Sequence, residues 1–236
     1  MPDSSNHFLA SLSDKDYSAL EPHLRTVQLK HQTQLYRTCQ AIDRVYFPAT
    51  AVISLVVNLS DGEMAEIAMM GRDGLVGGGV AMGMAKSLNE ATVQIPGTAY
   101  VLNAAAIKAA ADASETLREA MYRRDQLVLL QAQQSAACNV NHRVDKRLAR
   151  WLLRSHDLAE TEALRLTQEF LSQMLGVRRT TVTLFAKALQ KKGAIRYKRG
   201  LITIADKERL IEAACECNAA IKAHSEALLG IAATAH

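Results

Sequence analysis

Arginines and threonines stand side by side at one point of this 236-residue sequence, at the predicted start of a helix. The cluster consists of Arg178, Arg179, Thr180, Thr181 and Thr183. Positively charged side chains bind phosphates, and arginine and threonine also hydrogen-bond to the base edges that the major groove of DNA exposes. The cluster therefore predicts recognition of a polyanion, with a nucleic acid as the first candidate.

Two helices are predicted to position this cluster. Apolar residues recur at the spacing of a helical turn in two groups, which are Phe170, Leu171, Met174 and Leu175, and then Val182, Phe185, Ala186 and Leu189. Gly176 interrupts the pattern between the groups. A short helix, a glycine-containing turn and a second helix are typical of a helix-turn-helix, whose second helix enters the major groove.

The charge of the surrounding segment argues against an ordinary helical hairpin with solvated arginines. Residues 165–200 contain nine lysines and arginines but a single acid, Glu169. The whole chain has a net charge of +4, so the rest of it is acidic overall. Positive charge that is concentrated on one motif is typical of a surface that binds phosphates.

The flanking segments are predicted to complete a DNA-binding domain. Residues 194–197 and 201–204 read as two short strands, and Lys198 and Arg199 at their turn would lie near phosphates as the wing of a winged helix. An amphipathic helix over 141–154 should pack on the helix-turn-helix and bury Trp151. A helix over 207–215 and an alanine-rich helix without an assigned role follow the wing.

Short strands are predicted over residues 27–100, after a short helix that Ser13 or Asp14 would cap. Two hairpins are predicted, one joining 51–59 to 64–69 through Ser60-Asp61-Gly62 and one joining 92–95 to 99–102 through Pro96-Gly97. This pattern favours an antiparallel barrel or jelly roll. Six of the twelve glycines lie within residues 71–83. They leave two interpretations open, which are a backbone that a ligand can approach and tight corners of the barrel.

A long helix is predicted from Ser114-Glu115 to Cys138 or beyond, with a break and a hinge at 139–141. A helix of 25 residues is about 37 Å long. Pairing with a second copy of the chain would explain that length, and the alternative is a connector packed on its own domain. The apolar positions of this helix include Leu117, Met121, Leu127, Val128, Leu130, Ala132 and Ala136.

The composition excludes several classes of protein. No apolar run is long enough to span a bilayer and no signal peptide is evident, so we expect a cytoplasmic protein that does not bind membranes. The four cysteines are then expected to be reduced. No nucleophile–base pair and no phosphate-binding Gly-Lys-Ser/Thr motif occurs, so neither enzyme activity nor catalytic residues are expected.

In this order, the elements resemble the Crp/Fnr superfamily of bacterial transcription regulators. The resemblance covers roughly residues 25–212, and its most specific matches are Leu166-Thr167, Leu175-Gly176-Val177, Arg179-Thr180-Thr181-Val182 and Gly193-Ala194-Ile195. It implies an α+β fold with three parts. Residues 1–110 would form an N-terminal antiparallel β-roll like the cyclic-nucleotide-binding jelly roll. Residues 111–140 would form a long dimerisation helix with the hinge, and residues 141–236 a C-terminal winged helix-turn-helix with a helical tail.

The chain departs from the cyclic AMP receptors of this family in its predicted pocket. Their Gly-Glu-x-Gly motif and later Arg-Ser/Thr pair are replaced by Gly71-Arg72-Asp73-Gly74 and by Asn89-Glu90. Glu90 would repel a cyclic phosphate, so cyclic AMP is not expected as the effector. These six residues remain the candidate site for another ligand. On the recognition helix, Thr180 stands in place of the family's glutamate and Leu184 in place of its last arginine, which should change the operator that is read.

Other cofactors of the family are not expected either. Its iron–sulfur members use several cysteines near the N-terminus, where this chain has only Cys39. His7, His23, His31 and Cys39 are candidates for haem ligands by location alone. Cys215-x-Cys217 matches metal-binding spacing poorly, and Cys138 is expected to be a small buried side chain rather than a redox group. No metal site is therefore predicted.

The expected function is sequence-specific regulation of transcription by a homodimer on a palindromic operator. Expected base contacts come from Arg179 and Thr180, with Thr181 or Thr183. Expected phosphate contacts come from Thr167, Gln168, Arg178, Lys187, Lys198 and Arg199. The expected partners are double-stranded DNA, a second copy of the chain, RNA polymerase and an unidentified small-molecule effector. The alternative is a ligand-binding signalling module whose basic wing contacts an acidic protein or a membrane surface.

Overall fold

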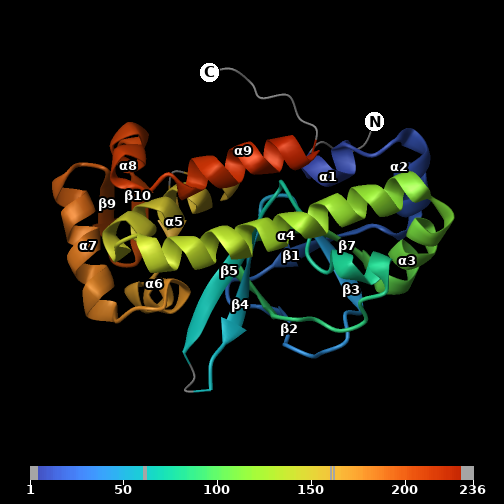
Figure 1. Cartoon of the computed structure of the whole chain (residues 1–236), viewed down its shortest axis with the longest axis horizontal. Coiled ribbons are helices and arrows are strands. Elements are labelled where there is room, and N and C mark those ends of the chain that lie inside the picture. The colour runs from blue at the N-terminus through green and yellow to red at the C-terminus, as the bar shows by residue number, and fades with distance from the viewer. Residues whose placement is uncertain (1–4, 61–62, 160, 162, 230–236) are drawn as a thin grey trace. The chain divides into compact units, whose positions relative to one another are not determined.

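The computed structural model describes residues 5–60, 63–159, 161 and 163–229 (Figure 1). The chain forms two compact units. The first unit comprises Met1–Leu55 and Met69–Leu129, and the second comprises Val56–Ala68 and Leu130–His236. The long helix, which the sequence predicts as a segment of its own, contributes residues up to Leu129 to the first unit and residues from Leu130 to the second. The three predicted segments stay a prediction.

Short helices begin the first unit. Helix α1 (His7–Ala10) starts at Asn6, whose side-chain oxygen accepts from the backbone N–H groups of Phe8 and Leu9. Helix α2 (Asp14–Leu20) is capped by Ser13, whose hydroxyl oxygen accepts from the N–H of Asp16. The cap predicted at Ser13 or Asp14 is thus formed by Ser13. A short 3-10 helix, η1 (Glu21–His23), leads into the strands.

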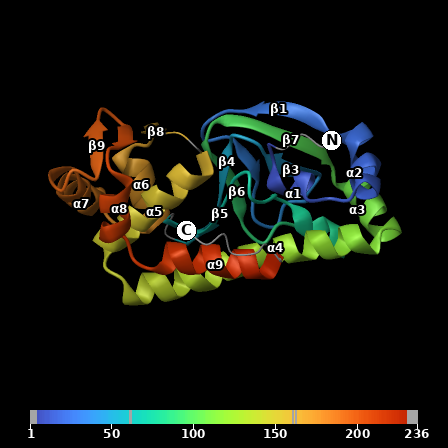
Figure 2. The same cartoon turned by 90° about the horizontal axis from the view of Figure 1, so that it is seen from above.

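Seven strands form two sheets, which confirms the predicted antiparallel β-roll. The order in one sheet is β1 (Arg25–Leu29), β7 (Gly97–Asn103) and β3 (Arg44–Pro48), and β1 and β7 run side by side in Figure 2. The order in the other is β2 (Gln34–Tyr36), β6 (Glu90–Ile95), β4 (Val52–Asn58) and β5 (Met64–Met70). Inward-facing residues of these strands, Val45, Phe47, Ile53 and Val93 among them, are fully buried.

One of the two predicted hairpins is wrong. Strands β6 and β7 belong to different sheets, because β7 pairs with β1 and β3. Pro96-Gly97 is therefore a corner at which the chain passes from one sheet to the other. Gly97 fits that corner because a Cβ there would lie 2.6 Å from the backbone nitrogen of Ala51. Strands β4 and β5 are neighbours, as predicted, but Asp61 and Gly62 of their turn lie outside the described residues.

The glycine-rich segment after β5 contains a second 3-10 helix, η2 (Gly78–Met82). Gly77 precedes it with φ 92°, and a Cβ there would lie 2.6 Å from the Tyr36 hydroxyl. Only glycine meets both the backbone and the space requirement at this position. At Gly77, the structure thus supports the interpretation of the glycines as barrel corners.

The predicted long helix is α4 (Glu115–Asn141), and it follows α3 (Ala104–Ala113). Three of its predicted apolar positions, Leu117, Met121 and Leu127, are buried within the chain, so they do not face a partner. The break is also later than predicted. The N–H of His142 still donates to the carbonyl of Cys138 at 2.9 Å, and the next helix, α5, begins at Val144.

A winged helix-turn-helix follows, as predicted. It consists of α5 (Val144–Ala159), β8 (Ala163–Arg165), α6 (Gln168–Leu175), α7 (Arg179–Lys191), β9 (Ile195–Lys198) and β10 (Leu201–Ile204). Strand β8 was not predicted, and it extends the wing into a sheet of order β8-β10-β9. Helices α8 (Lys207–Ala213) and α9 (Cys217–Leu229) come next, and residues 230–236 of the tail lie outside the described part.

The core of this domain forms around Trp151 of α5, as predicted. Its ring lies edge-on to the ring of Phe170 on α6, with 6.3 Å between the ring centroids. The indole N–H donates to Glu66 of β5 at 2.9 Å, which satisfies the one polar group of a side chain that is only 2% exposed. Leu148 and Leu152 of α5 are fully buried in the same unit.

Replacing Gly176 should test how the turn between α6 and α7 is formed. Gly176 has φ 60° and ψ 47°, and a Cβ there would meet nothing within 4 Å. Gly176→Ala should therefore lower the free energy of unfolding by about 1–2 kcal/mol through backbone strain alone. Gly176→Asn should cost less, because asparagine tolerates the left-handed conformation. Urea unfolding of the full chain measures both variants, and equal stability of the alanine variant and the wild type would contradict this assignment.

Candidate nucleic-acid interface

Local capping sets the geometry of the helix-turn-helix. The hydroxyl oxygen of Thr167 accepts from the N–H of Phe170 at 3.1 Å and starts α6. Gly176 ends α6 in the left-handed conformation. Arg178 is the N-cap residue of α7, and its side chain makes no capping hydrogen bond. The guanidinium is exposed, so it is available to an outside anion at the positive end of the helix dipole.

One side of α7 is polar and open to solvent. Val182, Ala186 and Leu189 are buried, whereas Arg179, Thr180 and Lys187 are exposed. Leu184 lies one turn after Thr180 and is 62% exposed, which is unusual for a leucine. The sequence analysis noted Leu184 as a departure from the family and did not assign it a contact. Its exposure on the same side as Thr180 now marks it as a candidate contact residue.

The Thr183 side chain makes hydrogen bonds within the chain, and its predicted base contact stays a prediction. Its side chain is half-buried, and its hydroxyl lies 2.7 Å from Oε1 of Gln168 and 3.0 Å from the carbonyl of Arg179. Because the hydroxyl is the donor to Gln168, it holds that side chain in place and leaves the amide N–H₂ group of Gln168 to donate elsewhere. Thr183 is thus a positioning residue for Gln168. Thr181 is half-buried as well.

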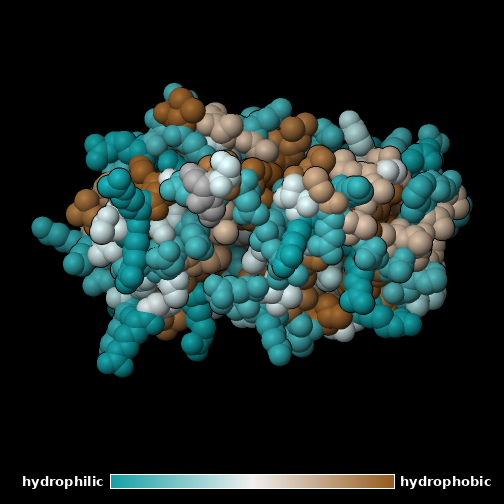
Figure 3. Space-filling model, turned by 90° about the horizontal axis from the view of Figure 1, so that it is seen from below, coloured by the Kyte–Doolittle hydropathy of each residue, from teal (hydrophilic) through white to brown (hydrophobic). Residues whose placement is uncertain are grey.

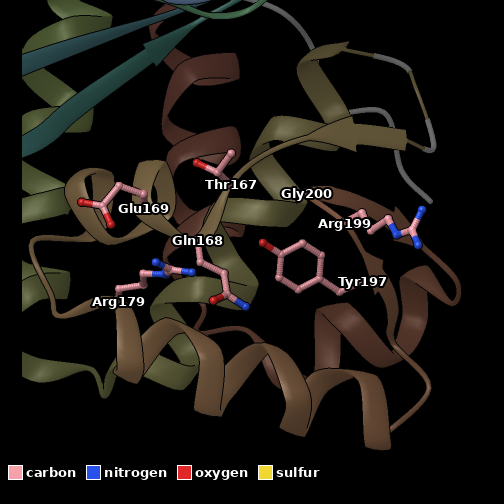
Figure 4. A pocket seen from close by; sticks show the side chains of 7 residues that line it. All are labelled: Thr167, Gln168, Glu169, Arg179, Tyr197, Arg199 and Gly200. Atoms are coloured by element: carbon pink, nitrogen blue, oxygen red, sulfur yellow. The ribbon is translucent and has the colours of Figure 1, made fainter.

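A hollow of about 570 Å³ lies where α6, α7 and the wing meet (Figure 4). Four predicted contact residues line it, namely Thr167, Gln168, Arg179 and Arg199. Glu169, Tyr197 and Gly200 complete its lining. Of the other predicted contact residues, Arg178, Thr180, Thr181, Thr183, Lys187 and Lys198 are not part of this lining.

Tyr197 is a lining residue that the sequence analysis missed. In Figure 4 its ring points toward Gln168. Its hydroxyl donates to the carbonyl of Leu166 at 3.3 Å. Burial raises the pKa of Tyr197, and the positive charge of Arg179 opposes this, so the phenol is protonated and remains a donor. The sequence feature that could have identified Tyr197 as a lining residue is its position as an aromatic residue in a basic strand of the wing.

The wing places its two basic residues at an exposed turn. Arg199 has φ 50° and Gly200 has φ 76°, and this tight turn joins β9 to β10. Lys198 and Arg199 are both exposed, as predicted, and the Arg199 side chain extends away from Gln168 in Figure 4. Figure 3 shows long hydrophilic side chains projecting at the end of the view where α6 and α7 lie. The arrangement is suited to binding a phosphate backbone at several points.

The backbone carbonyls of the predicted ligand segment, residues 71–74, accept hydrogen bonds from other residues of the first unit. The carbonyl of Arg72 accepts from the N–H of His7 at 2.8 Å, and that of Gly74 accepts from the side chain of Asn6 at 3.0 Å. The carbonyl of Asp73 accepts from Arg124 of α4. The N–H of Gly71 donates to the Asp73 side chain at 3.2 Å. Loop 71–74 is thus bound to α1 and α4 of its own unit.

Asn89 and Glu90 lie where β6 begins. The carbonyl of Asn89 accepts from the Ser87 hydroxyl at 2.6 Å, and the Glu90 carboxylate accepts from the Thr92 hydroxyl at 3.1 Å. Glu90 is half-buried, so its negative charge is partly shielded from water. These contacts place the two residues at a strand start and do not test whether a ligand binds there.

Side chains that could hold a metal ion come together in the second unit. Within the described residues, Cys138, His142, Cys215 and Cys217 form such a group, and His7, His23, His31 and Cys39 are not part of it. The spacing of Cys215 and Cys217 alone does not indicate such a group, because Cys138 and His142 come from a distant segment of the chain. Separately, none of the helices in the described ranges is both long and apolar enough to cross a membrane.

Comparison with known proteins agrees with this architecture. Residues 146–213 match the family model of the Crp-like helix-turn-helix domain. No curated protein matches the sequence. The likeness to solved structures extends over most of the chain, at low sequence identity.

Three of these structures illustrate the likeness. A protein from Eubacterium rectale assigned to the Crp/Fnr family of transcriptional regulators has a TM-score of 0.70 and 16% identity, covering 89% of this chain and 99% of its own. FixK2 from Bradyrhizobium japonicum has a TM-score of 0.67 and 16% identity, covering 81% and 98%. A Crp/Fnr-family regulator from Thermus thermophilus has a TM-score of 0.65 and 22% identity, covering 80% and 98%.

At these identities the solved structures show the shared fold, and the family match is specific to the helix-turn-helix domain. The β-roll, the long helix and the winged helix-turn-helix also follow one another in the predicted order. Residues 146–213 thus form a Crp-like helix-turn-helix domain, and the chain shares the fold of the solved Crp/Fnr-family transcription regulators.

Proposed function

We propose that this protein is a sequence-specific DNA-binding regulator that binds a palindromic operator as a homodimer in the cytoplasm. The observation that supports this most strongly is the exposed side of α7, where Arg178, Arg179 and Thr180 stand at the helix start. The hollow beside it adds the wing residue Arg199. We assign all of these groups to DNA binding, and no catalytic step to any of them.

The contacts are proposed to divide into base readout and phosphate binding. Arg179 and Thr180 would face base edges, with Thr181 beside them, and Leu184 would contact a thymine methyl group. Thr183 would act through Gln168. The proposed phosphate contacts are Thr167, Gln168, Arg178, Lys187, Lys198 and Arg199, which lie on α6 and α7, at their N-caps and on the wing.

An exposed stripe along α4 supports the homodimer. Tyr122, Leu129 and Val140 are 53%, 49% and 86% exposed, although each is apolar or aromatic. With Gln126, Gln133 and Ala136 between them, they follow the three- and four-residue steps of a coiled coil. We call these six residues the α4 stripe. Two-fold pairing through it would place two α7 helices on half-sites about one helical turn apart.

The sensor is proposed to respond to a ligand other than cyclic AMP, or to none. Arg72 stands where a cyclic AMP pocket of this family has a glutamate, and Asn89-Glu90 stands where that pocket has its Arg-Ser/Thr pair. The cation that would bind the cyclic phosphate is therefore missing, and an acid is added. The fold itself does not select the effector, since one protein that shares it, a regulator from Xanthomonas campestris, responds to c-di-GMP. An unidentified small molecule bound near Gly71–Gly74, Asn89 and Glu90, and RNA polymerase, are proposed as further partners.

Substitutions on α7 and on the wing should have different effects on DNA binding. Arg179→Ala should cost about 1–3 kcal/mol of operator affinity and relax the base preference at one position of each half-site. Lys198→Ala should weaken operator and unrelated DNA alike and reduce the salt dependence, because it removes a phosphate contact. Footprinting and titrations at several salt concentrations measure both effects.

Lys222→Ala is the matched control, since Lys222 is exposed on α9, outside the interface, and DNA binding should not change. If Arg179→Ala and Lys198→Ala behaved identically, the division into base and phosphate contacts would be wrong. If the wild type protected no palindrome and bound every sequence equally, the alternative of a signalling module with a basic docking surface would replace this function.

The dimer can be tested on the α4 stripe. Leu129→Glu would place two carboxylates in a symmetric interface, and we expect the dimer dissociation constant to rise at least about tenfold, which corresponds to about 1.4 kcal/mol. Leu88→Glu, at a leucine that is 72% exposed and lies outside α4, should leave the dimer intact. Sedimentation velocity measures the mass of each variant against the 25.8 kDa chain. A monomeric wild type would refute the homodimer.

Cyclic AMP binding can be measured directly by isothermal titration calorimetry. The purified chain should show no heat of binding at micromolar cyclic AMP, because the Glu90 carboxylate would repel the cyclic phosphate. A cyclic-AMP-binding member of the superfamily, titrated in the same calorimeter with the same ligand solution, shows that the ligand is active. Micromolar affinity for this chain would reject the proposed change of effector.

A further inference from the structure

Four sulfur and imidazole side chains from two distant segments meet near the end of α4. Cys138 lies in the last turn of α4, and His142 follows one turn later, its N–H donating to the carbonyl of Cys138 at 2.9 Å. Cys215 lies between α8 and α9, and Cys217 is the first residue of α9. The ligand atoms of all four side chains lie within 4.8 Å of one another. Three thiols and one imidazole are the donor set of a Cys₃His zinc site.

The shortest separations within this group match the edges of a tetrahedron. Bond lengths of 2.3 Å for zinc–sulfur and 2.0–2.1 Å for zinc–nitrogen place tetrahedral ligands about 3.8 Å apart for two sulfurs and about 3.5 Å apart for sulfur and nitrogen. Sγ of Cys138 lies 3.6 Å from Sγ of Cys215, and Sγ of Cys217 lies 3.5 Å from Nδ1 of His142. The other pairs would need to close by at most about 1.0 Å for two sulfurs and about 1.3 Å for sulfur and nitrogen to reach the tetrahedral spacing.

The surrounding polar groups orient the donors as they do in zinc proteins. Nε2 of His142, the nitrogen that faces away from Cys217, lies 3.1 Å from the carboxylate of Glu216. A carboxylate on the second imidazole nitrogen is a common way to hold a metal-binding histidine. Gln134 of α4 donates its amide N–H to Sγ of Cys217 at 3.2 Å, which stabilises negative charge on that sulfur.

Burial favours a structural site over a catalytic one. Cys138, Cys215 and Cys217 are 0%, 5% and 1% exposed, so no open position for water or substrate is evident among the sulfurs. Zinc binds cysteines as thiolates, so occupation of the site would release their protons.

We propose that Cys138, His142, Cys215 and Cys217 bind one Zn²⁺ ion, which fastens the segment that leads into α9 to the end of α4. Soft thiolate donors with one imidazole select zinc among the metals that proteins bind as closed tetrahedral sites. The ion would hold His142 beside the break between α4 and α5. This revises the expectation that the chain has no metal site. It does not depend on the proposed DNA binding.

Metal content and coordination can be measured on the full chain purified without chelator. We expect one zinc per chain by mass spectrometry of the metal, and the intense visible absorption of tetrahedral cobalt–thiolate coordination after replacement by Co²⁺. Cys39→Ser, at an exposed cysteine outside the group, is the matched control and should keep one zinc. Cys217→Ser should weaken zinc binding at least about tenfold, and His142→Asn should do so without removing a buried side chain.

Three outcomes would overturn the proposal. They are a wild-type zinc content no higher than that of Cys217→Ser, a Cys138–Cys215 disulfide in freshly purified protein shown by the loss of two hydrogens in its mass, and a different metal bound at full stoichiometry. Because Cys217→Ser could unfold locally, His142→Asn provides an independent variant, and its retention of full zinc affinity would also count against the site.

The anchoring role has its own readout. Removal of zinc by a chelator should increase hydrogen exchange of backbone amides at 215–229, because the start of α9 would lose its attachment to α4. Exchange in the first unit should change little, and Cys39→Ser should respond as the wild type does. Unchanged exchange of α9 in the metal-free protein would refute the proposed anchoring.

Discussion

The apolar stripe of α7 determines where the charges of this protein must lie. Val182, Ala186 and Leu189 are buried in the same unit as Trp151 and Phe170. A helix that buries one stripe must turn its opposite side to solvent. The arginines at the start of α7 are therefore exposed as a consequence of packing, and the wing and the Thr183–Gln168 hydrogen bond are built around that exposed side.

Different residues of helix α4 take part in different interactions. Leu117, Met121 and Leu127 are used by the chain's own core, so the apolar positions on that side are not available to a partner. The other side carries the α4 stripe, in which glutamines alternate with apolar residues. The end of the helix brings Cys138 and His142 to Cys215 and Cys217. One helix thus serves the core, the proposed dimer and the proposed zinc site.

In the first unit, the residues that determine the fold differ from those that would determine which ligand binds. Gly77 and Gly97 occupy corners that a Cβ would obstruct, so they preserve the β-roll whatever ligand it binds. Arg72 and Glu90 change the charges of the predicted pocket without disturbing those corners. A shared fold can accordingly carry a different effector, because fold depends on packing and ligand choice depends on a few charged groups.

Short-range signals in the sequence were enough to predict the helix-turn-helix, its wing, the Ser13 cap and the long helix. Periodicity, caps and turn residues act over a few positions, and Thr167 and Gly176 occupy the N-cap and the left-handed C-cap of α6. Four of the seven residues that line the hollow beside α7 are also predicted contacts, and the contacts themselves stay predictions. Sequence reasoning missed Tyr197 and Leu184, because their importance depends on which neighbours leave them exposed or turned into a hollow.

Contacts between distant segments were decided only by the tertiary structure. Strands β6 and β7 were predicted to pair because Pro96-Gly97 looks like a turn, yet β7 pairs with strands far away in the chain. The bond between Trp151 and Glu66 and the meeting of Cys138 with Cys215 join residues 85 and 77 positions apart. Such pairs leave no local trace in the sequence, because only the packing of whole elements determines which side chains meet.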